Sequence, residues 1–361
     1  MTAPVTIPIP EFPRNKTTAG PVSTTLTVPP PSRLTTPATD PDKIPVLASS
    51  TALEFVAEGA ANILFRCTPP PTSTPSLLRL RKTLPSSQPN LDAFRYLSTT
   101  AFPLFPPHLL VATSLIQLPP GLVTRTNGMI RDMEAQGTRL AKREGLMLEE
   151  QEEYGLLVAD MSPRGPHEVL IEFKPKWAVQ SPSAPAGWKR CRTCALRSMK
   201  AAHKGKPTPD GFCPLDLSSG EASRIRRAVE KIIPQSPPSA WKRDENHWPA
   251  DRIKLVDVVT DFLHGSELIP VIAALQKRLD PDGPLGSTMK KEFLDAMTVR
   301  DLTIFLRVSA ETGEIECGVG DLDLKTGEGG KRHYWRETER KLVEEGWYMK
   351  DGEGRGGCGG P

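Results

Sequence analysis

The chain has 361 residues, with 46 Lys or Arg against 43 Asp or Glu, and a formal net charge of +3. So small a basic excess does not indicate nucleic acid as a partner, although a mildly basic chain can still hold a strongly basic pocket. No run of about 18 apolar residues predicts a transmembrane helix, and no secretory signal is expected. The 6 cysteines are too few for a disulfide framework, so we expect an intracellular protein of the nucleus or cytoplasm.

The two ends of the chain differ in composition from the rest. The 38 prolines are about double the usual share. Residues 1–48 are rich in Pro, Ser and Thr, and we expect them to be disordered, because they bury too little apolar surface to offset their ordering entropy. Residues 349–361 form a Gly-rich tail in which Cys358 is expected to be inert. The folded part is therefore expected between these segments.

The first folded segment begins near Leu53 and predicts antiparallel strands. Ile63, Phe65 and Cys67 alternate on one face of the second strand of a predicted hairpin. This succession of strands predicts a meander, unlike the strand–helix repeats of a parallel sheet. Further predictions in this half are strands over 77–82, 154–161 and 167–177 and a helix within 127–153.

The second half is more helical. Apolar residues at helical spacing predict a helix that stops before Pro234, and Ser266 is the predicted N-cap of a later helix. Together the two halves predict an α+β fold. The elements predicted here are helices over 221–233, 266–279 and about 333–346, and strands over 301–309 and on the approach to 320–325.

Two motifs in the first half suggest a nucleotide site. The turn EGAAN at 58–62 has small residues that let backbone N–H groups approach a phosphate. Arg79 and Arg81 then share one face of a short strand, where a cation can pair with a triphosphate. A plain hairpin turn and a solvated basic strand are the alternatives at this point.

The motif KPK follows a predicted buried strand. Lys174 and Lys176 lie two residues apart and point into the same space, so their repulsion is destabilising unless an anion lies between them. Pro175 removes a backbone donor, as suits a strand that leaves its sheet. The motif favours an anion site, with a solvated lysine face as the alternative.

Three aspartates accompany predicted strands near the end of the chain. Asp301 opens an apolar strand, and Asp321 and Asp323 are expected on one face at the end of another. Phosphoryl transfer needs a carboxylate that positions the acceptor hydroxyl and carboxylates that hold magnesium. A turn cap is the alternative for this pair.

Cysteines near the middle of the chain have the spacing of a metal site. Cys191 and Cys194 form CRTC, and His203 and Cys213 follow. Four nitrogen and sulfur ligands of this kind can hold structural Zn²⁺. Reduced cysteines without a metal remain the alternative.

Taken in order, the segments EGAANILF, LLR, IEFKPKW, FCPLDLSSG, DLTIFL and DLDLK resemble the inositol-pentakisphosphate 2-kinases, with a fungal member as the expected relative. The resemblance covers about residues 50–348 in short islands. It implies a two-lobed inositol-phosphate-kinase-like fold, with a mainly antiparallel N-lobe over 49–161 that carries the ATP-binding turn and hinge. A larger mixed C-lobe over 162–348 would carry the inositol phosphate site and the catalytic aspartates.

The resemblance also implies roles for individual residues. Asp301 would be the catalytic base, and Lys174 would contact phosphate and stabilise the charge on the transferred group. Asp321, with Asp323, would hold Mg²⁺. After Lys325 the chain departs from the family pattern with TGEGGK. The implied ATP contacts are Glu58, Gly59, Asn62, Arg79, Asp160 and Met161, and the implied substrate contacts are Arg143, Lys176, Lys200, Lys325, Lys331 and Tyr334.

The expected function is therefore an ATP- and Mg²⁺-dependent kinase for the 2-hydroxyl of inositol 1,3,4,5,6-pentakisphosphate, giving inositol hexakisphosphate. We expect a monomer that neither inserts into membranes nor binds nucleic acid. One alternative is an inositide-binding scaffold, which would need neither Asp301 nor Asp321. Another is a zinc-dependent nucleic-acid-binding protein. Against this alternative, the basic stretch of this sequence has no aromatic residues interleaved with its basic ones. A third is a kinase for another inositol polyphosphate or a lipid.

Overall fold

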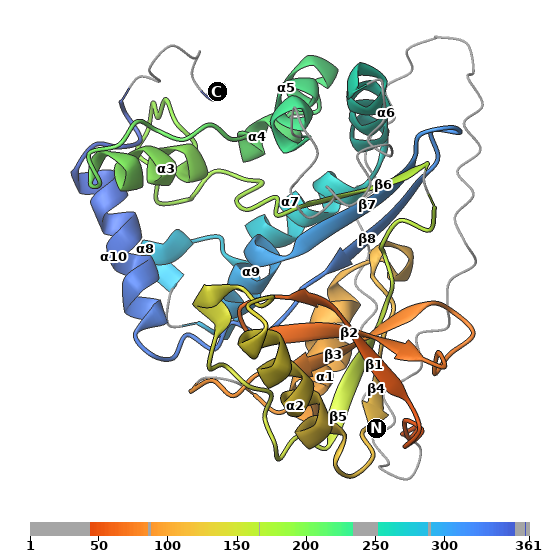
Figure 1. Cartoon of the computed structure of the whole chain (residues 1–361). Coiled ribbons are helices and arrows are strands. Elements are labelled where there is room, and N and C mark those ends of the chain that lie inside the picture. Colours follow the sequence, from red (N-terminus) through yellow and green to blue (C-terminus); the bar gives the residue numbers. More distant parts are fainter. Residues whose placement is uncertain are drawn as a thin grey trace, which may run out of the picture.

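Two antiparallel sheets organise the described part of the chain (Figure 1). The computed structural model describes residues 44–85, 88–165, 167–233, 252–287, 290–350 and 358. A five-stranded sheet of order β1-β2-β3-β5-β4 comes first, and a three-stranded sheet of order β6-β7-β8 follows. The α+β prediction is confirmed, with a sheet-rich N-terminal part. The strands are β1 (Ala52–Glu58), β2 (Asn62–Thr68), β3 (Ser76–Arg81), β4 (Thr113–Gln117), β5 (Tyr154–Ala159), β6 (Glu168–Phe173), β7 (Thr303–Ser309) and β8 (Ile315–Gly320).

Helices follow and separate the strands. The longer ones are α2, α6 and α10, and most of the helical residues lie after β6 (Figure 1). The α-helices are α1 (Asn90–Tyr96), α2 (Leu122–Ala135), α3 (Arg192–Ala202), α4 (Pro214–Leu217), α5 (Ala222–Ile232), α6 (Arg252–Gly265), α7 (Leu268–Leu279), α8 (Gly283–Ser287), α9 (Lys291–Asp301) and α10 (Lys331–Glu344). Shorter helical turns are η2 (Leu97–Ala101), η3 (Phe102–Leu104), η4 (Pro107–Leu109) and η5 (Ala141–Arg143).

The five-stranded sheet buries one face against α2. Ile63 and Phe65 alternate into this core as predicted, and both are fully buried. Ile130 of α2 belongs to the same cluster. Gly155 of β5 allows close packing, because an added Cβ would lie 2.6 Å from Leu78 Cδ1 and the buried leucines around it would have to shift.

The three-stranded sheet brings three strand ends to one edge. Phe173, the last residue of β6, pairs with Ile304 near the start of β7. Thr303, the first residue of β7, pairs with Gly320, the last of β8. Because neighbouring antiparallel strands run in opposite directions, residues just after β6, just before β7 and just after β8 lie close together.

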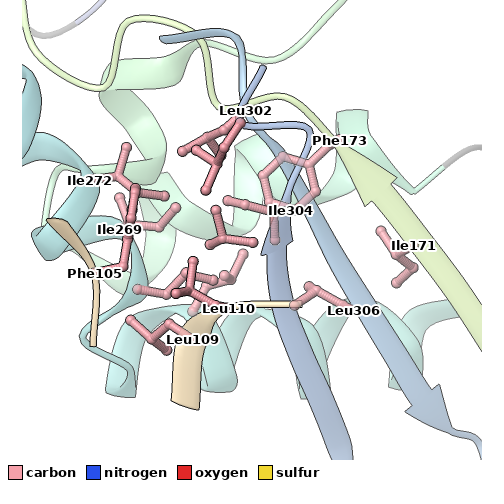
Figure 2. Packing of buried hydrophobic residues seen from close by; sticks show 14 of the residues in the cluster. Phe105, Leu109, Leu110, Ile171, Phe173, Ile269, Ile272, Leu302, Ile304 and Leu306 are labelled. Atoms are coloured by element: carbon pink, nitrogen blue, oxygen red, sulfur yellow. The ribbon is translucent and has the colours of Figure 1, made fainter. Parts of the chain in front are cut away.

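The larger core lies directly beneath this edge (Figure 2). Phe173, Leu302 and Ile304 are buried there, together with Ile269 and Ile272 of α7. The sheet edge is thus held by close packing on its inner side.

This core also receives residues from the first half of the chain. Phe105, Leu109 and Leu110 precede β4 in the sequence, yet they pack with Ile269 and Leu306 (Figure 2). Burial therefore links the segment before β4 to the second sheet. The division into lobes at residue 161 stays a prediction.

Several expected boundaries are corrected. The predicted helix within 127–153 is confined to α2, and α7 has Glu267 rather than Ser266 at its N-cap position. Asp301 ends α9 instead of opening β7. The helix extends into the motif DLTIFL, and the strand begins only at Thr303. Residues 1–43 lie outside the described ranges.

The start of the described chain also differs from expectation. Ile44 and Leu47 were assigned to the disordered segment, yet both are buried. Val46 forms a parallel bridge with Gln117 at the end of β4. Ordering of this short piece is stabilised by its two apolar side chains.

Within the described ranges, no single helix has both the length and the apolar character needed to cross a membrane. Helices spanning Arg252–Gly265 and Leu268–Gly286 pass that test only as a pair, bent by 51°.

Candidate active site

The predicted catalytic residues meet at the edge where the three strands of the second sheet end. Lys174 follows β6 directly, and Asp321 follows β8 directly. Asp301 lies two residues before β7. Their convergence follows from the antiparallel register, although they are up to 147 residues apart in sequence.

Asp301 lies among three lysines. Lys176 Nζ is 2.8 Å from Asp301 Oδ1, and Lys325 Nζ is 2.8 Å from Oδ2. Lys174 Nζ is 3.8 Å from Oδ1. Partial burial alone would raise the pKa of Asp301, but hydrogen bonds from Lys176 and Lys325 and their charges lower it to about 2. The carboxyl is therefore ionised across the neutral range.

Lys174 connects Asp301 with Asp321. Its ammonium donates to the backbone oxygen of Asp301 and pairs with the carboxylate of Asp321. Thr303 Oγ1 also donates to Asp321 Oδ2, at 3.4 Å. Three lysines and two carboxylates leave this group with a net positive charge, as an anion site requires.

The backbone is strained at two of these positions. Lys176 has φ 57° and Asp321 has φ 55°, in the left-handed region that side chains with a Cβ seldom adopt. Such outliers persist where neighbours hold them, and they cluster at functional sites. Gln276 of α7 provides one such restraint. Its Nε2 donates to Lys176 O at 2.7 Å, and its Oε1 accepts from Ala178 N at 2.9 Å.

A stack of two arginines on Trp177 supports the same segment. The guanidinium carbons of Arg192 and Arg300 lie 4.1 Å and 3.5 Å from the Trp177 ring centroid. Arg300 is buried and donates to Asp280 Oδ2 at 2.8 Å. Burial lowers the pKa of Arg300 to about 10, while Asp280 opposes the shift. Because Arg300 precedes Asp301, this stack fixes the chain next to the carboxylate.

The sequence reasoning did not find this supporting group. Trp177 was noted only as the end of a strand, and nothing local to Gln276 marks a partner more than 90 residues away. Arg300, the basic residue before Asp301, was the one sequence feature that could have indicated this supporting group. Positioning residues of this kind are recognised only from tertiary contacts.

Arg79 links the first sheet to the aspartate-rich segment after β8. Its NH2 lies 2.5 Å from Asp323 Oδ1, across 244 residues of sequence. Asp321 and Asp323 therefore contact different partners, which corrects the expectation that they share one strand face. Asp323 O also accepts a hydrogen bond from Thr298 Oγ1 of α9 at 3.2 Å. Both aspartates are half-exposed oxygen donors, the type that Mg²⁺ prefers.

Buried charged side chains stabilise the predicted ATP-binding turn. Glu58 is buried between Lys82 Nζ at 2.7 Å and Arg139 NH2 at 2.7 Å. Lys82 Nζ also donates to Gly59 O at 2.9 Å. Burial raises the pKa of Glu58, but hydrogen bonds from Arg139 and Lys82 outweigh it and lower the pKa. The Glu58 side chain thus supports the turn, and its direct contact with a nucleotide stays a prediction.

The turn itself is closed by its own backbone. Gly59 N donates to Asn62 O at 2.9 Å, and Lys82 N donates to Ala61 O at 2.8 Å. Ala60 and Ala61 present only methyl groups, so a phosphate can approach the backbone. The nucleotide roles of Gly59 and Asn62 stay predictions.

The predicted hinge joins β5 of the first sheet to β6 of the second. Arg307 NH1 donates to Asp160 O at 3.0 Å and to Ser162 O at 3.1 Å. Asp160 Oδ1 accepts from Ser162 N at 2.8 Å, and Met161 is buried. Arg307 therefore fixes this connection to β7.

The remaining predicted substrate contacts lie in two places. Lys200 of α3 lies beside Tyr334 of α10; burial raises the pKa of Tyr334, but the Lys200 charge and hydrogen bond lower it overall. Arg143 lies near Lys82, whose pKa its charge helps to lower after burial. Lys331 is the first residue of α10. Among the described residues, no side-chain contact recorded for these four reaches Asp301, so their substrate roles stay predictions.

The structure replaces one member of the predicted zinc group. Cys191, Cys194 and Cys213 do meet, but the fourth member is Cys358 of the tail instead of His203. His203 Nε2 instead lies 3.3 Å from Glu345 Oε2, on the exposed side of α3. Cys358 is therefore not an isolated thiol, and the Gly-rich composition around it gave no signal of this contact.

Comparison with known proteins gives a family for this arrangement. Residues 55–341 match the model of the family described as inositol-pentakisphosphate 2-kinase. The chain is also similar to the inositol-pentakisphosphate 2-kinase of Yarrowia lipolytica (strain CLIB 122 / E 150), with 29% identity over 313 residues. That match covers 82% of this chain and 93% of the relative. The chain, with Asp301 among Lys174, Lys176 and Lys325, belongs to the inositol-pentakisphosphate 2-kinase family and is a kinase.

Proposed function

We propose that the protein transfers the γ-phosphate of ATP to the 2-hydroxyl of inositol 1,3,4,5,6-pentakisphosphate and releases inositol hexakisphosphate. The observation that carries this proposal is the Asp301 carboxylate, which is contacted by Lys176 and Lys325 and lies beside the Lys174–Asp321 pair. A reactive carboxylate inside a ring of cations suits an acceptor that is a hydroxyl surrounded by phosphates.

Charge supports a highly phosphorylated acceptor. Five phosphate groups carry roughly −8 to −10 charges near neutral pH. Each charge-assisted contact from a lysine contributes on the order of 1.5–3 kcal/mol. Lys174 and Lys176 come from one segment and Lys325 from another, and the repulsion among their charges favours an anion between them. Lys200, Lys331 and Arg143 are proposed to complete the set of phosphate contacts.

Asp301 is proposed to orient the 2-hydroxyl and to accept its proton. While Lys176 and Lys325 contact it, its low pKa makes it a weak base. Substrate phosphates compete for Lys176 and Lys325, and as these ammonium groups turn toward the phosphates, the pKa of Asp301 rises. The incoming substrate thus makes the carboxylate a better proton acceptor at the moment it is needed.

Asp321 and Asp323 are proposed to hold Mg²⁺, because both present half-exposed carboxylate oxygens close to Lys174 and Arg79. The metal would supply charge neutralisation of the triphosphate. Lys174 would then contact the transferred group, and Arg79 would turn from Asp323 toward the nucleotide. These residues give the electrostatic stabilisation that phosphoryl transfer requires.

The experiment that tests the proposal is a transfer assay on the full chain. The protein is incubated with γ-labelled ATP, MgCl₂ and a panel of acceptors: inositol pentakisphosphate isomers, tetrakisphosphates and vesicles that contain phosphatidylinositol bisphosphate. The products are separated by anion-exchange chromatography, and NMR gives the new phosphate position. We expect transfer to the isomer with a free 2-hydroxyl.

The same assay separates the alternatives. Transfer only to another inositol phosphate or to the lipid would replace the proposed acceptor. No transfer to any acceptor, together with calorimetric binding of inositol phosphates, would support a scaffold. As a control, Asp301→Ala should abolish transfer and keep ATP binding, which normal turnover in this variant would contradict.

A further inference from the structure

The hydroxyl of Thr298 contacts the segment after β8 that carries Asp323 and Lys325. Thr298 belongs to α9, and it is only 1% exposed. Its Oγ1 donates to Asp323 O at 3.2 Å and accepts from Lys325 N at 3.2 Å. We propose that Thr298 is a positioning residue for phosphoryl transfer, because its hydroxyl sets the places of Asp323 and Lys325. This inference rests on the function proposed above.

The segment that Thr298 contacts has no regular structure of its own. Residues 321–327, between β8 and α10, form neither a helix nor a strand. The place of such a backbone depends on contacts with neighbouring elements. Leu322 is buried in the larger core and anchors the start of the segment. Thr298 provides a second anchor, since one hydroxyl both donates and accepts and binds the backbone on each side of Leu324.

The last turn of α9 contacts Lys325 at two points. Thr298 and Asp301 are three residues apart in this turn, so they lie on the same side of the helix. Thr298 binds the backbone N–H of Lys325, and Asp301 Oδ2 lies 2.8 Å from its Nζ. A shift of the Lys325 backbone would therefore move the ammonium away from the carboxylate that is proposed to accept the proton.

The same hydroxyl also fixes the residue that pairs with Arg79. Thr298 binds the carbonyl of Asp323, and the carboxylate of Asp323 pairs with Arg79. Asp323 is a proposed Mg²⁺ ligand, and Lys325 is a proposed contact of the acceptor. Groups that orient a ligand through hydrogen bonds affect activity without touching the substrate. One buried hydroxyl therefore serves both the metal side and the acceptor side of the candidate site.

A contact with α1 restrains the part of α9 that presents Thr298. Tyr96 OH donates to Asp295 Oδ1 at 2.9 Å, and Asp295 lies three residues before Thr298. Burial raises the pKa of Tyr96, and the Asp295 charge adds to this rise, while the neighbouring Thr298 hydroxyl opposes it. The phenol therefore stays protonated and keeps donating to Asp295. This contact holds the helix, and Thr298 then holds the segment after β8.

Steady-state kinetics of the full chain tests the role of the hydroxyl. Thr298→Val keeps nearly the shape of the side chain but leaves the Asp323 carbonyl and the Lys325 N–H without their partner. With ATP and MgCl₂, we expect kcat/KM for inositol pentakisphosphate to fall by about 10- to 100-fold. Thr298→Ser keeps the hydroxyl and should restore most of the rate. Unchanged kinetics in Thr298→Val would overturn the proposal.

Thr260→Val is the matched control. Thr260 of α6 is likewise a buried helical threonine, but its Oγ1 has no hydrogen-bond partner among the residues that the structure describes. Its replacement should leave kcat/KM unchanged. A similar loss in Thr260→Val would assign the effect of Thr298→Val to the general cost of changing a buried threonine, and would contradict the positioning role.

A double-mutant cycle separates positioning from stability. Lys325→Ala removes the ammonium but keeps the backbone N–H that Thr298 binds. In this background, Thr298→Val should raise the KM for the acceptor no further, because the ammonium that the hydroxyl positions is already gone. A loss of stability alone would add to the effect of Lys325→Ala. The full rise of the acceptor KM in both backgrounds would therefore overturn the proposal.

Hydrogen exchange without substrate separates this inference from the proposed function. Mass spectrometry with fragmentation resolves the Lys325 amide, which should exchange at least about tenfold faster in Thr298→Val than in the wild type, Thr298→Ser or Thr260→Val. A wild type that transfers phosphate to no inositol phosphate would contradict the proposed function, while the exchange rates would still show whether Thr298 places Lys325. Equal exchange in all four proteins would overturn that placement.

The wild type alone also provides a test, in case Thr298→Val does not fold. Thr298→Ala then takes its place, since it removes the hydroxyl with less bulk. In the folded wild type, the Lys325 amide should exchange far more slowly than the same amide in an unstructured peptide. Exchange at the peptide rate would mean that the Thr298 hydroxyl does not hold this backbone, and would overturn the proposal without any variant.

Discussion

Arg79 and Asp323 form an ion pair that joins β3 of the first sheet to the segment after β8, with NH2 and Oδ1 separated by 2.5 Å. Arg79 is the proposed nucleotide contact and Asp323 a proposed Mg²⁺ ligand, and in this structure the two side chains bind each other. Arg79 Nε is buried and has no hydrogen-bond partner in the described structure. A nucleotide that draws Arg79 away would free Asp323 for a metal ion, so the two binding events are expected to be coupled.

Arg79→Ala should therefore weaken nucleotide binding. Loss of a charge-assisted hydrogen bond costs about 1.5–3 kcal/mol, which corresponds to a roughly 10- to 150-fold higher KM for ATP. The KM for the inositol phosphate should change far less. Steady-state kinetics with each substrate varied in turn checks this.

Arg81→Ala provides the matched control, because Arg81 lies on the same strand but pairs with Glu152. This change should lower the free energy of unfolding by about 1–3 kcal/mol and leave the KM for ATP nearly unchanged. An equal rise of the KM in both variants would assign the effect of Arg79 to stability of the sheet.

Asp301→Asn should separate turnover from acceptor binding. A general base contributes about 10²–10⁴-fold to the rate, so kcat should fall by that factor. The inositol phosphate should nevertheless bind more tightly, because one negative charge leaves the lysine cluster. A unit charge about 5 Å away contributes on the order of 1–3 kcal/mol, so Kd should fall by about fivefold or more.

Calorimetry and single-turnover kinetics measure these two quantities on the same protein. Asp282→Asn is the control, since Asp282 also pairs with a lysine, Lys290, on the exposed surface. This variant should change neither kcat nor Kd. Weaker acceptor binding in Asp301→Asn would show that the carboxylate contacts the acceptor as a binding group.

The low pKa of Asp301 also predicts a pH dependence of stability. Its folded pKa of about 2 lies below the ordinary aspartate pKa of 3.8, because Lys176 and Lys325 contact the carboxylate. A carboxyl with a lowered folded pKa stabilises the fold above its unfolded pKa, and this contribution is lost as the pH falls through the folded pKa. The advantage of wild type over Asp301→Asn in denaturant unfolding should be constant above about pH 4 and shrink between about pH 4 and 2. A difference that shrinks already near pH 6 would contradict this.

The convergence of Lys174, Asp301 and Asp321 at one sheet edge could be predicted from the sequence because these residues lie at or near strand ends. Lys174 follows an apolar run with clear alternation, and Asp321 follows another. Such patterns report local structure, and antiparallel pairing then brings the ends together. Asp301 was found by the same pattern, although the structure places it at the end of a helix.

The contacts that support this edge could not be predicted in the same way. Gln276 holds the backbone around Lys176 across 100 residues, and Cys358 joins a cysteine group that lies well over 100 residues earlier. Neither residue has a periodic or spaced local pattern. Their roles depend on which helices pack together, and that is decided by burial across the whole chain.

Substitution of Lys176 by Gly or by Ala should separate its charge from its backbone. Both variants lose the ammonium that contacts Asp301, so both should raise the KM for the inositol phosphate by a similar factor. Only glycine adopts φ 57° without a clash between Cβ and the following carbonyl. Lys176→Gly should therefore be more stable than Lys176→Ala by about 1 kcal/mol, even though glycine loses more entropy on folding. Urea unfolding of the two variants measures the difference, and equal stabilities would mean that Gln276 and its neighbours hold this conformation without strain.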